Sequence, residues 1–392
     1  MAAPPRQFTV IASLGVGQIL VWGSSYYLPA VLTRPIAAST GWPAPWITGS
    51  LSIGLLVSGL LSPAAGRLIE RHGGRPVLAA SAVLLAIGLA VLGLAPSLPV
   101  FVAGWVVIGF GMAAGLYDPA FATLGQLYGE HARRSITHLT LIGGFSSTIC
   151  WPLAALLESH FGWRGACFAF AAVALLVVLP AYLFGVPARP PPPPPTHRRA
   201  AGPVRMRRDQ TVAFVILAAA LTLASFIMTV IAVELLAMLQ ARGLSLATAV
   251  GLGALIGPSQ VGARFLESLI GRGRHPVWSL VASSALVAVG LLTLAGGTGA
   301  ISVGLIVYGA GSGIRSIAQG TVPLALFGGE GYATLMGRLA FPKLVAQAAA
   351  PSVGTLLLDH WGVEATIGAM LGIAVLNLAI SLALIPWALR PK

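Results

Sequence analysis

The sequence predicts an all-α membrane protein in which twelve transmembrane helices form two pseudo-symmetric six-helix bundles. Three observations lead to this fold class. Hydrophobic residues make up 57% of the 392 residues, and charged residues only 8%. Twelve apolar segments are each long enough to cross a bilayer, and the two halves of the chain resemble each other. A soluble domain of this size needs a far more polar surface, so the composition excludes that class.

Apolar segments of bilayer length set the helix count. An α-helix rises 1.5 Å per residue, so about 20 apolar residues cross the hydrocarbon core. The first segment is too long for the core of a signal peptide, and we expect it to be retained. The predicted spans are 8–33, 46–69, 77–95, 99–123, 137–157 and 164–186 in the first half, and 211–238, 247–270, 277–295, 299–324, 341–358 and 364–388 in the second.

Lysine and arginine concentrate in one set of connections and at both ends of the chain. Because basic residues stay on the cytoplasmic side, both termini are predicted to be cytoplasmic in a multi-pass protein of the cell inner membrane. The net charge of +13 is then a topology signal, and nucleic acid is not an expected partner. The cytoplasmic set is Arg6, Arg67, Arg71, Arg75, Arg133, Arg134, Arg189, Arg198, Arg199, Arg205, Arg207, Arg208, Arg272, Arg274, Arg338, Lys343, Arg390 and Lys392; the opposite set is Arg34, Arg164 and Arg242.

A proline run over 190–195 and a basic stretch interrupt the helical pattern near the middle of the chain. Such a run favours an extended, semi-rigid polyproline II spacer. The predicted organisation is a first bundle over 1–186, a cytoplasmic Pro-rich basic linker over 187–210 and a second bundle over 211–392.

The two halves match each other at an offset near 200 residues. The shared offset indicates duplication, and repeated halves are typical of transporters that hold substrate near the midplane, where the halves meet. The matches are Gly109 and Gly111 with Gly309 and Gly311, Pro76 with Pro276, and Leu156, Leu157, His160 and Gly162 with Leu356, Leu357, His360 and Gly362.

The connection between the second and third spans carries a charged glycine turn, Gly-Arg-Leu-Ile-Glu-Arg-His-Gly-Gly-Arg-Pro over 66–76. Glycine permits a tight turn, and a carboxylate can pair with a neighbouring arginine or a helix N-terminus. The alternative is a solvated basic loop. The predicted conformational latch consists of Gly66, Glu70, Arg71, Gly73 and Arg75.

This run resembles the helix 2–3 signature of the major facilitator superfamily, Gly-x-Leu-x-Asp-Arg-x-Gly-x-Arg, with Glu70 where aspartate is usual. With the twelve spans, the repeat and the linker, the resemblance covers nearly the whole chain and implies alternating access between two bundles. Segments 109–119 and 260–264 resemble the monocarboxylate and oxalate transporter branch, whose members place a substrate-binding arginine near the position of Arg264. The helix 5 pattern of drug:proton antiporters is missing at 150–153, which disfavours multidrug efflux.

Charged residues inside the apolar spans are the candidate site, because a charge in hydrocarbon costs several kcal/mol and usually faces a cavity. Gln260, Arg264 and Glu267 share one helix face at positions i, i+4 and i+7. We expect Arg264 to bind an anionic group; the alternative is a neutralising Arg264–Glu267 pair.

Asp118 and Arg315 lie at comparable depth in the fourth and tenth spans. Asp118 is predicted to carry a coupling proton, since burial favours a protonated carboxyl group, and Arg315 to bind substrate. The alternatives are an Asp118–Arg315 ion pair between bundles or a packing role for Asp118. Glu234 is either an outer-gate carboxylate or a water-exposed side chain.

The predicted set is therefore substrate-binding Arg264, Arg315, Gln260, Tyr117, Tyr26 and Tyr308, with proton-coupling Asp118, Glu267 and Glu234. Packing roles for the tyrosines are the alternative. Cys150 and Cys167 are expected to pack as small hydrophobes, without a disulfide or metal site.

The predicted function is secondary active transport of a small, monocarboxylate-like organic anion coupled to protons. Alternatives are efflux of a neutral, aromatic or toxic compound, and a non-transporting scaffold or sensor. No phosphate-binding loop of the Gly-x-x-x-x-Gly-Lys-Ser/Thr type occurs, so an ATP-driven pump is not expected. We expect a monomer that is not an enzyme and needs no cofactor. Its expected partners are a small-molecule substrate, the lipid bilayer and protons.

Overall fold

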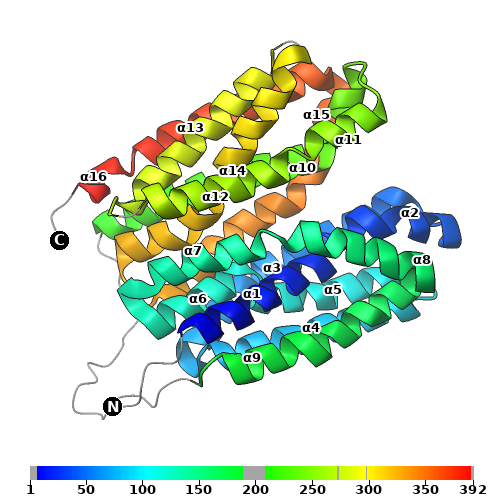
Figure 1. Cartoon of the computed structure of the whole chain (residues 1–392), viewed down its shortest axis with the longest axis horizontal. Helices are drawn as coiled ribbons and strands as arrows, with labels where there is room; N and C mark the ends of the chain where they lie inside the picture. Colours follow the sequence, from blue (N-terminus) through cyan, green and yellow to red (C-terminus); the bar gives the residue numbers. More distant parts are fainter. Residues whose placement is uncertain (1–6, 189–207, 272, 297, 390–392) are drawn as a thin grey trace.

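The computed structural model describes residues 7–188, 208–271, 273–296 and 298–389, and it contains helices but no strand in these residues (Figure 1). Helices of the first half are α1 (Gln7–Ser24), α2 (Leu28–Thr40), α3 (Ala44–His72), α4 (Gly74–Leu94), α5 (Leu98–Gly115), α6 (Tyr117–Tyr128), α7 (Ala132–Gly143), α8 (Ser146–Val173) and α9 (Leu179–Gly185). The second half has α10 (Arg208–Ala241), α11 (Leu246–Gly253), α12 (Ile256–Ile270), α13 (Pro276–Leu294), α14 (Ile301–Phe327), α15 (Tyr332–Leu382) and α16 (Ile385–Ala388).

Nine helical stretches of the described chain are long and apolar enough to cross a membrane. Two of them, of 54 and 57 residues, are far longer than one crossing needs. Each contains a break, at Gly162 (φ 67°) and at Gly362 (φ 76°), where only glycine adopts the backbone conformation without strain. Counting these as two crossings each gives eleven, and the broken pair α11–α12 supplies the twelfth.

The duplicated sequence gives duplicated geometry. Besides the two glycine breaks, the Nδ1 atoms of His160 and His360 lie 2.9 and 3.1 Å from the carbonyl oxygens of Leu156 and Leu356. The matched glycines also play matched packing roles. A Cβ atom at Gly109 would meet the backbone of α3, and one at Gly309 the backbone of α12, within 3 Å. Close helix approach thus explains why both halves keep glycine there.

Two boundaries differ from the sequence prediction. The first crossing continues through α2 to Thr40, and the eleventh begins at Tyr332 rather than at residue 341. Lys343 therefore lies eleven residues inside α15, about 16 Å from its start. Assigning Lys343 to a cytoplasmic connection was wrong. The glycine-rich segment 328–331, just before α15, made the start of this helix difficult to locate from the sequence.

The predicted linker over 187–210 lies largely outside the described residues. Its last residues belong to α10, which begins at Arg208, three residues earlier than expected. The division into two bundles at this linker stays a prediction. Below, the "linker end" of the molecule means the end where α9 finishes and α10 begins (Figure 1).

The two halves pack closely at the linker end. A Cβ atom at Gly66 in α3 would clash with the Ala333 carbonyl oxygen in α15, and one at Gly337 with the Ser62 carbonyl oxygen. Small residues let the two backbones approach, as they do between membrane helices generally. Figure 1 shows the ribbons of the two halves converging at this end, where α6 and α7 lie near α12 and α14, and diverging towards α2 and α11.

Candidate functional site

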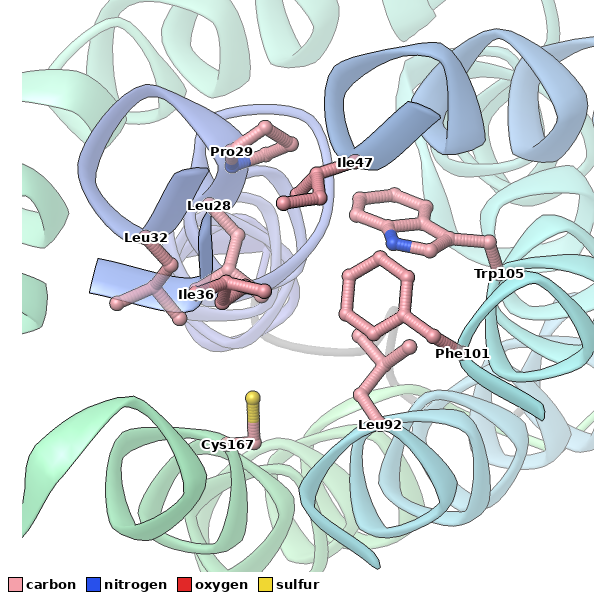
Figure 2. A pocket seen from close by; sticks show the side chains of 9 residues that line it. All are labelled: Leu28, Pro29, Leu32, Ile36, Ile47, Leu92, Phe101, Trp105 and Cys167. Carbon is pink, nitrogen blue, oxygen red and sulfur yellow. The ribbon is translucent and has the colours of Figure 1, made fainter. Parts of the chain in front are cut away.

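One small cavity lies inside the first half, away from the linker end (Figure 2). It holds about 10 Å³, roughly the space of one water molecule. Figure 2 shows side chains such as Leu32, Phe101 and Trp105 around it, with the Cys167 thiol at its edge. An apolar cavity of this size offers nothing to orient a polar solute, so the candidate site is the charged region where the halves meet.

Arg264 is buried in α12 and reaches across to the first half. Its exposed fraction is 6%. The guanidinium donates to the carbonyl oxygens of Thr140 in α7 (3.2 Å) and Gly313 in α14 (3.4 Å), and to the Gln260 side chain (3.5 Å). All three acceptors are neutral and the bonds are long. Arg264 is thus a buried cation without a carboxylate partner in the described chain.

The alternative Arg264–Glu267 pair does not form. The Glu267 carboxylate accepts a short hydrogen bond from the Ser279 hydroxyl in α13. A Cβ atom at Gly271 would also contact this carboxylate, which places Glu267 at the linker-end terminus of α12. Their spacing places Arg264 and Glu267 on one helix face, but the two side chains bond to different neighbouring helices.

Arg315 in α14 is a second buried cation with neutral partners, and its exposed fraction is 7%. It donates to the hydroxyl of Ser225 (3.4 Å) and to the side-chain oxygen of Gln319 (3.3 Å), and it contacts the Met228 sulfur (2.7 Å). Its Nε has no hydrogen-bond acceptor. The positive charge of this buried guanidinium is poorly compensated, because one N–H donor is unpaired and the other partners are neutral.

Asp118 pairs with Lys343, not with Arg315. The Lys343 Nζ lies 2.6 and 2.7 Å from the two Asp118 oxygens, and both side chains are buried. The alternative Asp118–Arg315 ion pair therefore does not form, although Arg315 interacts electrostatically with Asp118. This ion pair joins α6 to α15 and so links the two halves. Lys343 was the functional candidate that sequence reasoning missed, although a lysine between apolar residues 339–341 and 344–346 was a usable signal.

A cluster of aromatic side chains lies in the first half. Ring centroids lie 5.2 Å apart for Trp22–Tyr26, 5.3 Å for Tyr26–Tyr27 and 5.3 Å for Trp22–Tyr117. Tyr27 also packs edge-on against Trp151 at 6.0 Å. The predicted Tyr26 and Tyr117 thus belong to one group, and Trp22, which sequence reasoning missed, is at its centre.

The cluster lies within electrostatic range of both arginines. Tyr26 interacts with Thr229 of α10 and with the Arg315 charge, and Tyr308 of α14 also interacts with Arg315. Tyr27 and Tyr117 interact with the Arg264 charge. The structure therefore brings together the predicted tyrosines and the two predicted arginines.

Gln260 joins the same region. It lies in α12, one turn before Arg264, and its amide nitrogen donates to the Ser312 hydroxyl of α14 at 3.4 Å. Its oxygen accepts from Arg264. Gln260 therefore holds the guanidinium on the side of α14 and offers an amide to a ligand placed there.

Glu234 lies outside this region. It is 6% exposed, so the water-exposed alternative does not describe it. Its carboxylate accepts from the Thr355 hydroxyl of α15 at 2.7 Å. Along α10 it is nine residues beyond Ser225, the partner of Arg315, which corresponds to about 13 Å. A role at the end opposite the linker end stays a prediction.

The predicted latch residues lie around the turn between α3 and α4: Gly66, Glu70 and Arg71 in the last turns of α3, Gly73 between the helices and Arg75 at the start of α4. Gly73 has φ 86°, which permits the turn, and the Gln126 amide donates to the carbonyl oxygens of Ile69 and Glu70. These bonds tie the turn to α6 within the first half. Of the predicted latch residues, Gly66 packs against α15, at Ala333 and Gly337. Glu70 and Arg75 are half-buried and Arg71 is exposed.

We expect valine at Gly66 to separate the halves at the linker end, because its side chain would collide with the α15 backbone. Gly49 on the same helix has open space at its Cβ position, so Gly49→Val is the matched control. Spin labels at the exposed positions His72 and Arg338, in a background without Cys150 and Cys167, report the separation. Gly66→Val should lengthen the measured distances relative to the control. Equal distances would contradict the packing role of Gly66.

Twelve apolar crossings with buried charges at the contact between two related halves define a membrane transporter of the two-bundle class. The chain belongs to the Major Facilitator Superfamily, whose family model matches residues 14–341.

Relatives and solved structures agree with this class. Human monocarboxylate transporter 11 is 33% identical over 153 residues, which cover 37% of this chain and 31% of that protein. A probable chloroplastic anion transporter of rice is 27% identical over 195 residues, covering 48% and 35%. The chain thus aligns with about a third of the length of these relatives. The human organic anion transporter MFSD10 (TETRAN) has a TM-score of 0.78 at 17% identity, with 96% and 100% of the two chains covered, which shows the shared fold.

Proposed function

We propose that the protein carries a small organic anion by alternating access as a proton-coupled secondary transporter. One observation carries this proposal: Arg264 and Arg315 are buried where the halves meet, and neither has a carboxylate partner in the described residues. Uncompensated charges in a low-dielectric region are costly, so such groups are expected where a ligand supplies the counter-charge. The names of the relatives, a monocarboxylate and an anion transporter, support the same substrate class.

The inter-half contacts fit one state of an alternating-access cycle. Arg264 with Thr140, Asp118 with Lys343 and Gly66 with Ala333 all join the halves between mid-helix and the linker end. We place the linker end on the cytoplasmic side of the cell inner membrane, from the distribution of basic residues. The structure then corresponds to the outward-facing state, and these contacts break when the transporter opens inward.

Proton coupling is assigned to Asp118. Protonation would release Lys343, because a neutral carboxyl group no longer holds the ammonium ion. The two groups come from different halves, so the proton would control a contact that must open during transport. Glu267 and Glu234 are weaker candidates, since their bonds to Ser279 and Thr355 stay within the second half.

Uptake by the purified chain in proteoliposomes tests this function. We expect radiolabelled carboxylates to enter faster when the external side is acidic, and a protonophore to remove the stimulation. Transport of only neutral or aromatic compounds would favour the exporter alternative. Absence of any flux, together with no thermal stabilisation by any tested solute, would favour the scaffold alternative.

A further inference from the structure

The charge balance at the contact between the halves bears on how many negative charges the substrate carries. Five charged side chains are buried in the described residues: Asp118, Glu234, Arg264, Arg315 and Lys343. Glu234 lies apart, bonded to Thr355. Of the remaining four, Lys343 and Asp118 neutralise each other at 2.6 Å. Three cations and one carboxylate leave a net charge of +2, held by the two guanidinium groups.

The two guanidinium groups interact electrostatically, yet they bond to different neighbours. Arg315 experiences the positive charge of Arg264 and, more weakly, the negative charge of Asp118, whose carboxylate is bound to Lys343. Their hydrogen-bond partners do not overlap: Arg264 turns towards α7 and bonds Thr140, whereas Arg315 turns towards α10 and bonds Ser225. One carboxylate group at either position would leave the other guanidinium uncompensated. Two acid groups, one for each arginine, would satisfy both.

The region between the arginines suits an organic body rather than an inorganic ion. Tyr26 and Tyr27 are adjacent, and they interact with Arg315 and Arg264 respectively. A molecule that joins the two cations would therefore pass along this tyrosine pair and the neighbouring Trp22 ring. Aromatic rings offer apolar contact to a carbon chain, and the phenol groups offer hydrogen bonds.

We propose that the substrate is an organic dianion with two separate acid groups, such as a dicarboxylate, which bridges Arg264 and Arg315. This inference rests on the proposed anion transport and narrows it. The monocarboxylates named for the relatives would fill only half of the charge deficit. Neutralisation by Asp118 removes Lys343 from the ligands available to the anion in this state.

Matched ligands test the number of charges. The purified full chain in detergent is titrated with butanedioate, pentanedioate and hexanedioate, and with the monoamide of each, which keeps the length and removes one charge. Thermal stabilisation and calorimetric binding are measured at pH 7.5, where both carboxyl groups are ionised. We expect at least one dicarboxylate to bind about tenfold or more tightly than its monoamide, since about 1.4 kcal/mol of additional interaction corresponds to tenfold. Sulfate serves as the inorganic control and should bind more weakly.

A second arm uses Arg315→Gln, which removes one of the two cations. It should reduce the preference for the dicarboxylate over its monoamide to near unity while the monoamide still binds. The wild-type comparison stands whether or not this variant folds. Monoamides or monocarboxylates that bind wild type as tightly as the dicarboxylates would overturn the dianion inference and leave anion transport intact. Sulfate as the best ligand would overturn the organic bridging mode, and failure of every anion would overturn the proposed function itself.

Discussion

Replacing Arg264 by glutamine is expected to abolish anion uptake while the protein still inserts and folds. Glutamine keeps a hydrogen-bonding side chain for Thr140 or Gly313 but removes the charge. Losing one member of a buried, hydrogen-bonded charge pair with the substrate costs about 2–5 kcal/mol, or roughly 30-fold to several thousand-fold in affinity. Uptake of the labelled anion in proteoliposomes measures the loss.

Two controls separate charge from general damage. Arg34 is exposed at the end opposite the linker end, so Arg34→Gln should transport like wild type. Arg264→Lys keeps the charge without the planar fork and should retain partial uptake, because lysine does not replace bidentate binding fully. Unchanged uptake by Arg264→Gln, with a normal melting temperature, would remove Arg264 from the site.

The second large effect concerns the Asp118–Lys343 pair. Asp118→Asn should lower the stability of the folded protein by about 3–5 kcal/mol, because it leaves the Lys343 ammonium buried without a counter-charge. Thermal unfolding in detergent measures the change. Asp359 lies exposed in α15, so Asp359→Asn is the matched control and should unfold like wild type.

The double variant Asp118→Asn with Lys343→Met should recover most of the lost stability, since removing both charges of a buried pair is often close to neutral. It should not recover proton coupling. Uptake by folded variants that lack Asp118 should no longer depend on external pH. A pH dependence equal to that of wild type would refute the coupling role, and a single variant as stable as wild type would refute the pair.

Much of the fold could be predicted because the lipid bilayer restricts which backbone structures can cross it. Backbone groups in hydrocarbon must bond within their own helix, so apolar runs of bilayer length identify the crossings. Duplication then made equivalent features visible, such as the breaks at Gly162 and Gly362. The first and eleventh crossings were misjudged at their ends because turns and small residues blur hydropathy there.

The site was only partly predictable because its partners come from distant segments. Asp118 and Lys343 are 225 positions apart, and nothing local marks them as a pair. Spacing along one helix suggested Arg264 with Glu267, but packing turned Glu267 towards Ser279 in the next crossing. Similar depth in the membrane suggested a pair of Asp118 with Arg315. The carboxylate of Asp118 instead binds Lys343 of α15. Sequence identified which residues are unusual, and tertiary packing decided which of them meet.

A structure of the protein with a bound anion tests the central claim most directly. A cryo-electron microscopy map of the full chain, prepared with the tightest dicarboxylate from the titrations, would locate the ligand. The account predicts ligand oxygens within hydrogen-bonding distance of both Arg264 and Arg315, with the carbon chain along Tyr26 and Tyr27. A ligand bound elsewhere, with Arg264 still on Thr140 and Arg315 still on Met228, would contradict it.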